Sequence, residues 1–231
     1  HVASYPDVDW PAFAERFVTS LGLLFNPYTT QIEPHDNVAE IGDAARRAAL
    51  DEALRDGLPG PRTEAWKYTS LRQLERRSCA AREALPSPAP RPLADIPAPR
   101  AVFVNGCYSV ALSLTTDLPD GVSLQLLSEA LAEGGDAARF LQRRFERTDE
   151  VFARLNAALA TEGLLLRAEA DVRSEQPLHL VFIGTEDGAD RAWHLRNLIE
   201  LRAGAALTVV EHHFAATPHA HFINALSHVH L

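Results

Sequence analysis

The residues best suited to bind a metal are histidines close to the C-terminal end of the sequence. Six of the ten histidines lie in the last twenty residues: His212, His213, His219, His221, His228 and His230. Side chains alternate between the faces of a strand, so His219 with His221, and His228 with His230, would project as pairs. Imidazole nitrogens bind Zn²⁺ or Fe²⁺, which makes these four residues candidate metal ligands. No fixed motif such as His-Glu-x-x-His is present, so surface or partner-facing histidines are the competing interpretation.

The two cysteines offer less chemistry. Cys79 and Cys107 lie far apart in the sequence and form no Cys-x-x-Cys motif. A conventional iron–sulfur cluster needs four ligands, so either thiol could supply at most one ligand to a site completed by another chain. The competing interpretation is a small buried side chain for Cys107 and a bystander for Cys79. Free thiols fit a reducing cytosol better than a disulfide does.

Paired carboxylates that could act in acid–base catalysis have simpler explanations. Asp117 and Asp120 flank a proline turn, and Glu200 and Glu211 near the ends of successive strands suit a ladder of satisfied polar side chains. The sequence contains no Gly-x-Ser-x-Gly, Walker A or dinucleotide-binding glycine motif. We therefore predict no catalytic residues and expect that the chain is not an enzyme.

The first part of the chain is predicted to be helical. Apolar residues recur at helical spacing over residues 7–25 and again from about Asn37 to Leu54, after which Gly57 and Pro59 stop the helix. A third, short helix should begin near Thr63 or Thr69. We predict a helical N-terminal domain over residues 1–85.

Six prolines crowd residues 86–99, which predicts an extended linker between domains. Residues 100–163 then mix strands, at 101–105 and 122–126, with helices. Together these features predict a linker at 86–99 followed by a mixed α/β region.

From residue 164 onward the hydrophobic pattern changes to the period of two that is typical of strands. Predicted strands cover residues 164–172, 178–183, 194–201, 206–212 and 221–231. Their starts are about 13 to 16 residues apart, which is typical of the coils of a solenoid. We predict an α+β fold in which the helical domain precedes a right-handed parallel β-helix at 164–231, with a β-sandwich as the alternative. The pattern is still alternating at Leu231, so we expect the β-helix to be incomplete at the C-terminus.

One short segment carries several unusual residues. Residues 57–71 read Gly-Leu-Pro-Gly-Pro-Arg-Thr-Glu-Ala-Trp-Lys-Tyr-Thr-Ser-Leu, and Lys67 is the single lysine among 22 basic residues. Its ammonium group, flanked by Trp66 and Tyr68, can donate in three directions past the two rings. A helix start with aromatic packing and a surface charge is the competing interpretation.

This segment resembles the N-terminal hallmark of the SufD family, the scaffold subunit of a bacterial iron–sulfur cluster assembly system. The residues that carry the resemblance are Arg62, Glu64, Trp66, Lys67, Tyr68 and Thr69. Shorter similarities follow in order at residues 102–106, 121–124, 127–131, 152–158, 175–178, 196–201 and 209–212. The likeness spans roughly residues 55 to 231.

The resemblance implies a non-catalytic scaffold that pairs with a SufB-like subunit and with the SufC-like ATPase. It also implies a parallel β-helix and a transient iron–sulfur cluster held by the complex, with no cofactor bound tightly by this chain. A homodimer is possible for the isolated subunit. The alternatives are a histidine-rich metal-binding protein and a β-helical carbohydrate-active enzyme.

Charge and hydropathy exclude other classes. The net charge is −9, which disfavours a nucleic-acid partner because binding to a phosphate backbone needs a basic face. No apolar run approaches the length of a membrane span. We expect a cytoplasmic protein with neither nucleic-acid nor membrane partners.

Overall fold

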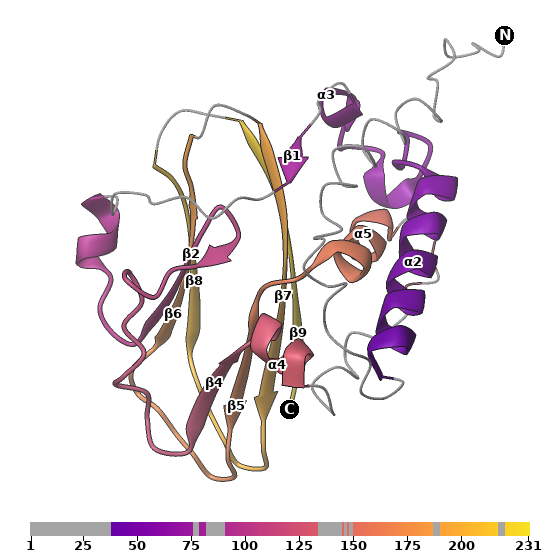
Figure 1. Ribbon diagram of the computed structural model, residues 1–231. Coiled ribbons are helices and arrows are strands. Elements are labelled where there is room, and N and C mark those ends of the chain that lie inside the picture. Colours follow the sequence, from indigo (N-terminus) through magenta and orange to yellow (C-terminus); the bar gives the residue numbers. More distant parts are fainter. Residues whose placement is uncertain are drawn as a thin grey trace, which may run out of the picture.

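Two β-sheets face each other, and helices cover the outer side of one of them (Figure 1). The computed structural model describes residues 38–75, 79–81, 91–133, 145, 147, 150–186, 190–216 and 220–231. Its helices are α2 (Val38–Asp56), η2 (Glu64–Trp66), α3 (Arg72–Glu75), η3 (Arg91–Asp95), α4 (Leu127–Glu133) and α5 (Val151–Leu159). Its strands are β1 (Ala80–Ala81), β2 (Arg100–Val104), β3 (Cys107–Tyr108), β4 (Val122–Leu126), β5 (Leu164–Ala168), β6 (Leu178–Gly184), β7 (Arg191–Leu201), β8 (Val209–Ala215) and β9 (His221–His230).

The chain passes back and forth between the two sheets. The first sheet contains β1, β4, β5, β7 and β9, and the second contains β3, β2, β6 and β8 in that order. From β5 to β9, consecutive strands therefore belong to alternate sheets. Within each sheet the neighbours β5, β7 and β9, and likewise β2, β6 and β8, are parallel. Antiparallel pairs occur only between β2 and β3 and between β4 and β5 among the named strands.

The register between neighbouring parallel strands repeats after similar lengths of chain. Leu165 pairs with Leu198, and Leu198 in turn pairs with His228 on the following strand of the same sheet. In the other sheet Leu178 pairs with Val209 over a comparable stretch. Parallel strands need such long connections, and here each connection includes a strand of the opposite sheet. The predicted β-helix, with its handedness, stays a prediction at this point.

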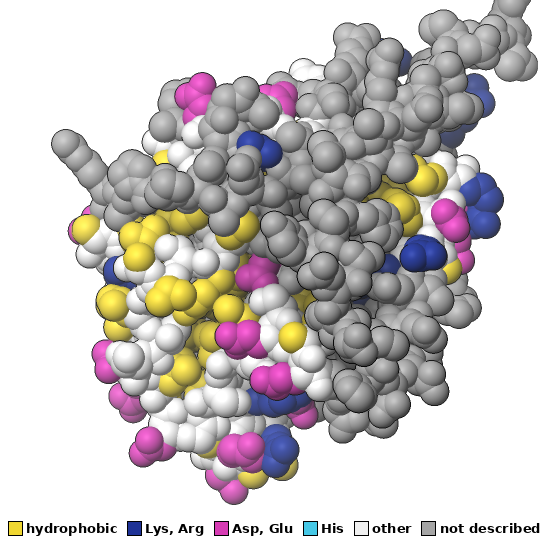
Figure 2. All heavy atoms as spheres, viewed as in Figure 1, with side chains coloured by type: hydrophobic (Ala, Val, Ile, Leu, Met, Phe, Trp, Pro, Cys, Tyr) yellow, Lys and Arg dark blue, Asp and Glu magenta, His cyan; other side chains and the backbone are white. Residues whose placement is uncertain are grey.

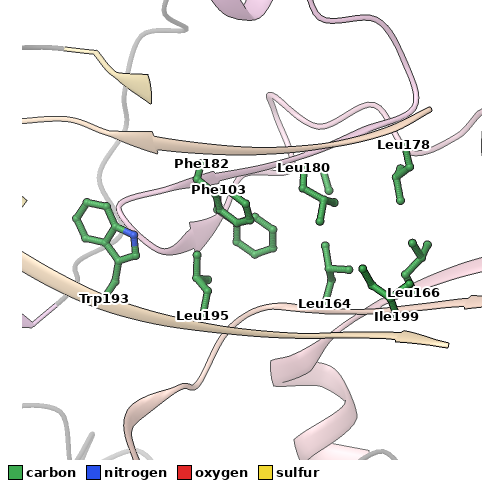
Figure 3. Packing of buried hydrophobic residues seen from close by; sticks show 10 residues of the cluster. Phe103, Leu164, Leu166, Leu178, Leu180, Phe182, Trp193, Leu195 and Ile199 are labelled. Atoms are coloured by element: carbon green, nitrogen blue, oxygen red, sulfur yellow. The ribbon is translucent and has the colours of Figure 1, made fainter. Parts of the chain in front are cut away.

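The main hydrophobic core fills the space between the sheets (Figure 3). Phe182 and Leu180 of β6 point towards Trp193 and Leu195 of β7, and Phe103 packs beside Phe182. Each of these five side chains is at most 2% exposed. Alternating residues of β6 and β7 face this core, which matches the period of two seen in the sequence.

Both outer faces of the sheets are also covered. Leu93 and Ile96, from the proline-rich segment, pack on Val102, Val181 and neighbouring residues of the second sheet. The segment therefore does not run as an extended linker at this point: residues Arg91–Asp95 form a 3₁₀ helix, because burial of Leu93 and Ile96 favours a compact turn over an extended tether. The predicted domain boundaries themselves stay a prediction.

Helices α4, α5 and α2 cover the first sheet. Leu127 and Ala130 of α4 pack against Leu165 and Leu198, whereas Val151 and Leu155 of α5 pack against Ala53 of α2. Figure 1 shows α5 lying between the sheet and α2. The predicted helix at residues 7–25 lies outside the described residues.

On the face seen in Figure 2, acidic side chains are scattered among hydrophobic and uncharged ones. The described residues of this face form no large group of Lys and Arg side chains. No helix in the described part of the chain is both long enough and apolar enough to cross a membrane.

Candidate functional site

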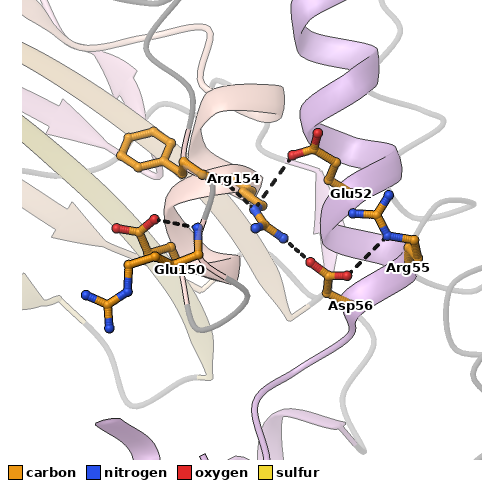
Figure 4. Close-up of polar contacts among 7 residues, drawn as sticks. Glu52, Arg55, Asp56, Glu150 and Arg154 are labelled. Carbon is orange, nitrogen blue, oxygen red and sulfur yellow. Dashed lines mark hydrogen bonds and ion pairs between the residues drawn. The ribbon is translucent and has the colours of Figure 1, made fainter.

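A buried arginine joins α5 to α2 (Figure 4). Arg154 is 3% exposed and donates from Nε to the carbonyl oxygen of Phe145 at 2.7 Å. Its Nη1 bonds the carboxylate of Asp56, and its Nε lies 3.8 Å from Glu52 Oε2. The hydrogen bond from Arg154 lowers the pKa of Asp56, in spite of the opposing effect of burial. These groups fix the position of the helix pair, and their mutual satisfaction leaves them no evident chemical role.

A polar group is buried between α5 and the first sheet. Asn156 Nδ2 donates to the carbonyl oxygens of Leu195 and Asn224, at 2.8 and 2.9 Å. Asn224 Nδ2 donates to Phe152 O at 2.7 Å and lies 3.1 Å from His194 Nδ1. Since the amide donates there, His194 Nδ1 accepts and its proton is on Nε2. The network attaches α5 to β7 and β9.

Burial keeps the His194 imidazole neutral. Desolvation lowers its pKa from 6.5 to about 4. Among the described residues, neither His194 Nε2 nor Asn156 Oδ1 has a hydrogen-bond partner. Because His194 is only 4% exposed, a substrate cannot reach it in this arrangement, and its role is structural.

An exposed histidine–glutamate pair lies on the inner face of β8, close to the inner face of β9. These two strands are the last strands of their sheets. His213 Nε2 is 3.5 Å from Glu211 Oε2, and Ser227 Oγ is 3.5 Å from Glu211 Oε1. The buried Asn197 of the neighbouring strand β7 donates a hydrogen bond to Ser227 Oγ, with a distance of 3.3 Å between the two atoms. The His213 and Glu211 side chains are 47% and 40% exposed. An exposed imidazole beside a carboxylate can accept and release a proton, so Glu211, His213 and Ser227 form the candidate site.

Stacked rings support this candidate site from below. Phe182 stacks between two rings: its centroid lies 5.6 Å from that of Phe103 and 4.9 Å from that of His213. In the other sheet His221 stacks on Trp193 at 4.9 Å. Both stacks thus end in an imidazole on the last strand of their sheet. The stacking fixes the orientation of the His213 ring while leaving its edge accessible.

A pair of imidazoles lies on the outer face of the second sheet, the one that contains β6 and β8. His179 Nδ1 of β6 is 2.9 Å from His212 Nε2 of β8, and the ring centroids are 5.1 Å apart. His179 is 7% exposed, whereas His212 is half-buried. Desolvation, and to a lesser extent His212, lower the pKa of His179.

The three predicted metal ligands that lie within the described residues do not come together. His221 packs on Trp193 of the inner core, whereas His228 is buried beside Arg196, whose Nε lies 3.2 Å from its Nε2. His221 and His228 therefore lie on opposite faces of β9. His230 is exposed, and His219 lies outside the described residues. In the described ranges no three His, Cys, Asp or Glu side chains gather as a metal site.

The segment that carries Trp66 and Lys67 forms a turn and the short helix η2. Trp66 packs against Phe152 of α5 with centroids 5.1 Å apart. Lys67 pairs with Glu64 and lies 5.0 Å above the ring of Tyr68, which is 91% exposed. Arg62 and Thr69 are exposed. Aromatic packing with a surface charge, which was the competing interpretation, describes this geometry.

Both cysteines are thiols rather than halves of a disulfide, with Cys79 buried and Cys107 half-buried.

No family model matches the chain. Part of the chain is similar to curated proteins named adenylosuccinate lyase. The protein of that name from Escherichia coli K12 is 45% identical over 82 residues, and the one from Haemophilus influenzae is 43% identical over 82 residues. The protein from Buchnera aphidicola of Acyrthosiphon pisum is 58% identical over 80 residues. The match covers 35% of this chain and 16% of the E. coli protein, so the chain spans about one sixth of the length of these relatives.

These relatives overturn the assignment to SufD. They are named for a lyase, which is an enzyme, so the predicted non-catalytic scaffold and the absence of enzymatic function are wrong. The predicted SufB-like and SufC-like partners, and the homodimer inferred with them, fall for the same reason. The physical cause of the error is the shortness of the motifs: a few turn and aromatic residues recur in unrelated chains, whereas identity over 82 residues does not. The alternatives, a histidine-rich metal-binding protein and a carbohydrate-active enzyme, gain no support from these names.

Sequence reasoning missed the groups that the structure brings together. It placed Glu211 in a ladder with Glu200, but Glu211 lies beside His213 and Ser227, while Glu200 pairs with Arg167 at 3.0 Å. The spacing Glu-x-His within one strand was the available signal, because residues two apart share a face. No local signal pointed to Asn156 and His194, which Asn224 links: Asn156 donates to the Asn224 carbonyl oxygen, and the Asn224 amide lies 3.1 Å from His194 Nδ1.

Proposed function

We propose that this chain takes part in the cleavage of adenylosuccinate, as a component of a protein related to adenylosuccinate lyases. The observation that carries the proposal is the identity of 45% over 82 residues to the E. coli protein of that name. Several relatives from different bacteria share the name and a similar span. About two thirds of the chain lies outside the match, so the similarity accounts for only part of the molecule.

The candidate site offers groups whose chemistry suits a lyase. A lyase breaks a bond by elimination, for which one group removes a proton and another protonates the leaving group. His213 presents an exposed imidazole, and the Glu211 carboxylate lies 3.5 Å from its Nε2, where it can orient the ring. We assign His213 as the proton-transfer residue and Glu211 as the residue that positions it.

The experiment is an assay of the purified full chain with adenylosuccinate, whose consumption is followed by anion-exchange chromatography. The E. coli adenylosuccinate lyase is the positive control. We expect slow consumption by this chain and a loss of at least about 100-fold on His213→Asn, since general acid–base catalysis contributes factors of that size. His230→Asn is the matched control, because His230 is an exposed imidazole on the other face of β9. An inert chain overturns the proposed function; an active chain unaffected by His213→Asn overturns only the residue assignment.

We also propose that the strand-rich part of the chain is a right-handed parallel β-helix. Support comes from strands that alternate between two sheets and from the parallel registers that link Leu165 to Leu198, Leu198 to His228 and Leu178 to Val209. Parallel crossovers are right-handed in about 98% of known cases.

The two thiols are compatible with the further proposal that the protein resides in the cytoplasm.

A cross-link tests this coil arrangement. Arg167 and Glu200 are register partners on neighbouring turns of the chain, with both side chains partly exposed. In a background in which Cys79 and Cys107 are replaced by alanine, Arg167→Cys with Glu200→Cys should form a disulfide that peptide mass spectrometry detects. Arg167→Cys with Arg202→Cys should not, because two residues along a strand add about 6 to 7 Å. Equal linkage in both variants would remove the proposed register.

A further inference from the structure

The imidazoles of His179 and His212 face each other across two parallel strands. His179 Nδ1 and His212 Nε2 are 2.9 Å apart, and the ring planes are inclined by 41°. The backbone places them there, because Val181 of β6 is the register partner of His212 and His179 lies two residues before Val181, on the same face. Two ring nitrogens at this distance share a single proton, held by one ring and accepted by the other.

A metal ion can take the place of that proton. With Zn–N bonds of about 2.0 to 2.1 Å and tetrahedral angles, two nitrogen ligands of one ion lie roughly 3.4 Å apart. The observed separation of 2.9 Å is therefore about 0.5 Å from the required one. His212 is only half-buried, so its ring can move outward by this amount.

The surroundings of His179 favour the form that binds metals. His179 is 7% exposed, and burial disfavours the positively charged form of its imidazole. Within the described part of the chain, the second nitrogen of this ring, Nε2, has no hydrogen-bond partner. The His179–His212 hydrogen bond is therefore the single polar contact of the ring among the described residues, and a ligand that replaces the shared proton breaks no other side-chain contact.

We propose that His179 and His212 form a two-imidazole site for a divalent transition-metal ion of the Zn²⁺ or Cu²⁺ class, and that the ion joins β6 to β8. Water completes the coordination, since the described residues supply no third ligand. Imidazole nitrogens suit both ions, and Cu²⁺ binds more tightly than Zn²⁺ to a given set of nitrogen ligands. The site is a local structural one, independent of the proposed lyase function, and uses none of the four histidines predicted from the sequence.

Titration of the full chain with Cu²⁺ alone tests the proposal. We expect the tightest site to hold one Cu²⁺ with two imidazole nitrogens in its electron paramagnetic resonance spectrum. His212→Gln and His179→Gln should each weaken this site by at least about tenfold, because each removes one of two ligands. The melting temperature without metal shows whether each variant is folded. If the buried His179→Gln variant fails to fold, the half-buried His212→Gln variant decides.

His213→Gln is the matched control. His213 follows His212 in the same strand but faces the inner side, where it stacks on Phe182. It should leave the tightest Cu²⁺ site unchanged. Equal binding by wild type and His212→Gln overturns the proposal and leaves a pair that shares only a proton. A loss in His213→Gln as large as that in His212→Gln overturns it too, since the ion would then bind on the opposite face.

Discussion

Gly163 is the residue at which two backbones come closest. Its φ is +143°, and a Cβ added there would lie 2.0 Å from the carbonyl oxygen of Arg196 in β7. The neighbouring Glu162 accepts a hydrogen bond from Arg196 N at 2.9 Å, which draws the two segments together. Only glycine combines this φ with this approach.

Gly163→Ala should therefore destabilise the fold by about 3 kcal/mol or more, from backbone strain together with overpacking. The measurement is the free energy of unfolding in urea. Gly60→Ala is the control: nothing lies within 4 Å of its added Cβ, and we expect a change of at most about 1 kcal/mol. Similar stabilities for the two variants would show that β5 and β7 do not approach as described.

His194 makes stability depend on pH. Its pKa is about 4 in the folded chain and 6.5 when it is exposed, so below pH 6.5 the unfolded chain takes up a proton that the folded chain excludes. This contribution to stability is complete above pH 6.5 and falls by up to about 3 kcal/mol as the pH drops to 4.

The check is the slope of unfolding free energy against pH between 6.5 and 4.5. His194→Gln should reduce that slope, although the variant is less stable overall. The lowered pKa values of Asp56 and His179 also make stability fall as the pH drops. Both groups are present in the wild type and in His194→Gln, so the difference between the two slopes isolates His194. His230→Gln should keep the full slope. An unchanged slope in His194→Gln contradicts the burial of a neutral imidazole.

At the scale of elements, α5 is held from both sides. Asn156 and Asn224 attach it to the sheet, and Arg154 attaches it to α2. Helix α2 reaches the described sheets chiefly through α5, so its docking depends on that one layer.

Arg154→Met should cost roughly 3 to 5 kcal/mol, because it leaves the partly buried Asp56 without its main partner. Hydrogen exchange should speed up in α2 more than in β7. Arg55→Met is the matched control: Arg55 also pairs with Asp56, but its side chain is 69% exposed, and such pairs contribute about 1 kcal/mol or less. If exchange in α2 is unchanged in Arg154→Met, another contact holds the helix.

The sequence predicts the positions of helices and strands better than it predicts which residues of different elements come into contact. The strand predicted at 122–126 coincides with β4, and the helix predicted from about Asn37 to Leu54 agrees with α2 within two residues, since hydrophobic period and glycine stops are local signals. The strand predicted from residue 206 begins too early, because alanine and leucine before Val209 are as apolar as the strand itself. The contact of His179 with His212 depends on strand register, and the contact of Asn156 with Asn224 depends on helix docking; no local pattern encodes either.

At the scale of the whole molecule, parallel neighbours are always distant in sequence. Even Leu198 and His228, a close pair by this measure, are separated by the whole of β8 and its two connections. The separation is far greater between Arg100 and His179, and greater still between Ala80 and Arg191. The loop-closure entropy of such contacts must be overcome before they stabilise the chain, which slows folding.

Refolding of the sheets should therefore take milliseconds to seconds and lag behind helix formation. Trp193, 2% exposed in the core, can report on it by stopped-flow fluorescence in a variant carrying Trp10→Phe and Trp66→Phe. Far-UV circular dichroism in the helical band is the comparison signal. Simultaneous microsecond phases in both signals would contradict this order of events.

The repeating register also restricts how such a gene can change in length. Leu165, Leu198 and His228 occupy equivalent places on successive strands. Duplication of one whole winding would give each copied side chain the same kind of neighbours as the original. A single inserted codon inside β7 would instead turn every following side chain of that strand to the opposite face. Natural length variation should thus accumulate in the connecting turns, or in steps of one complete winding such as the stretch from Leu198 to His228.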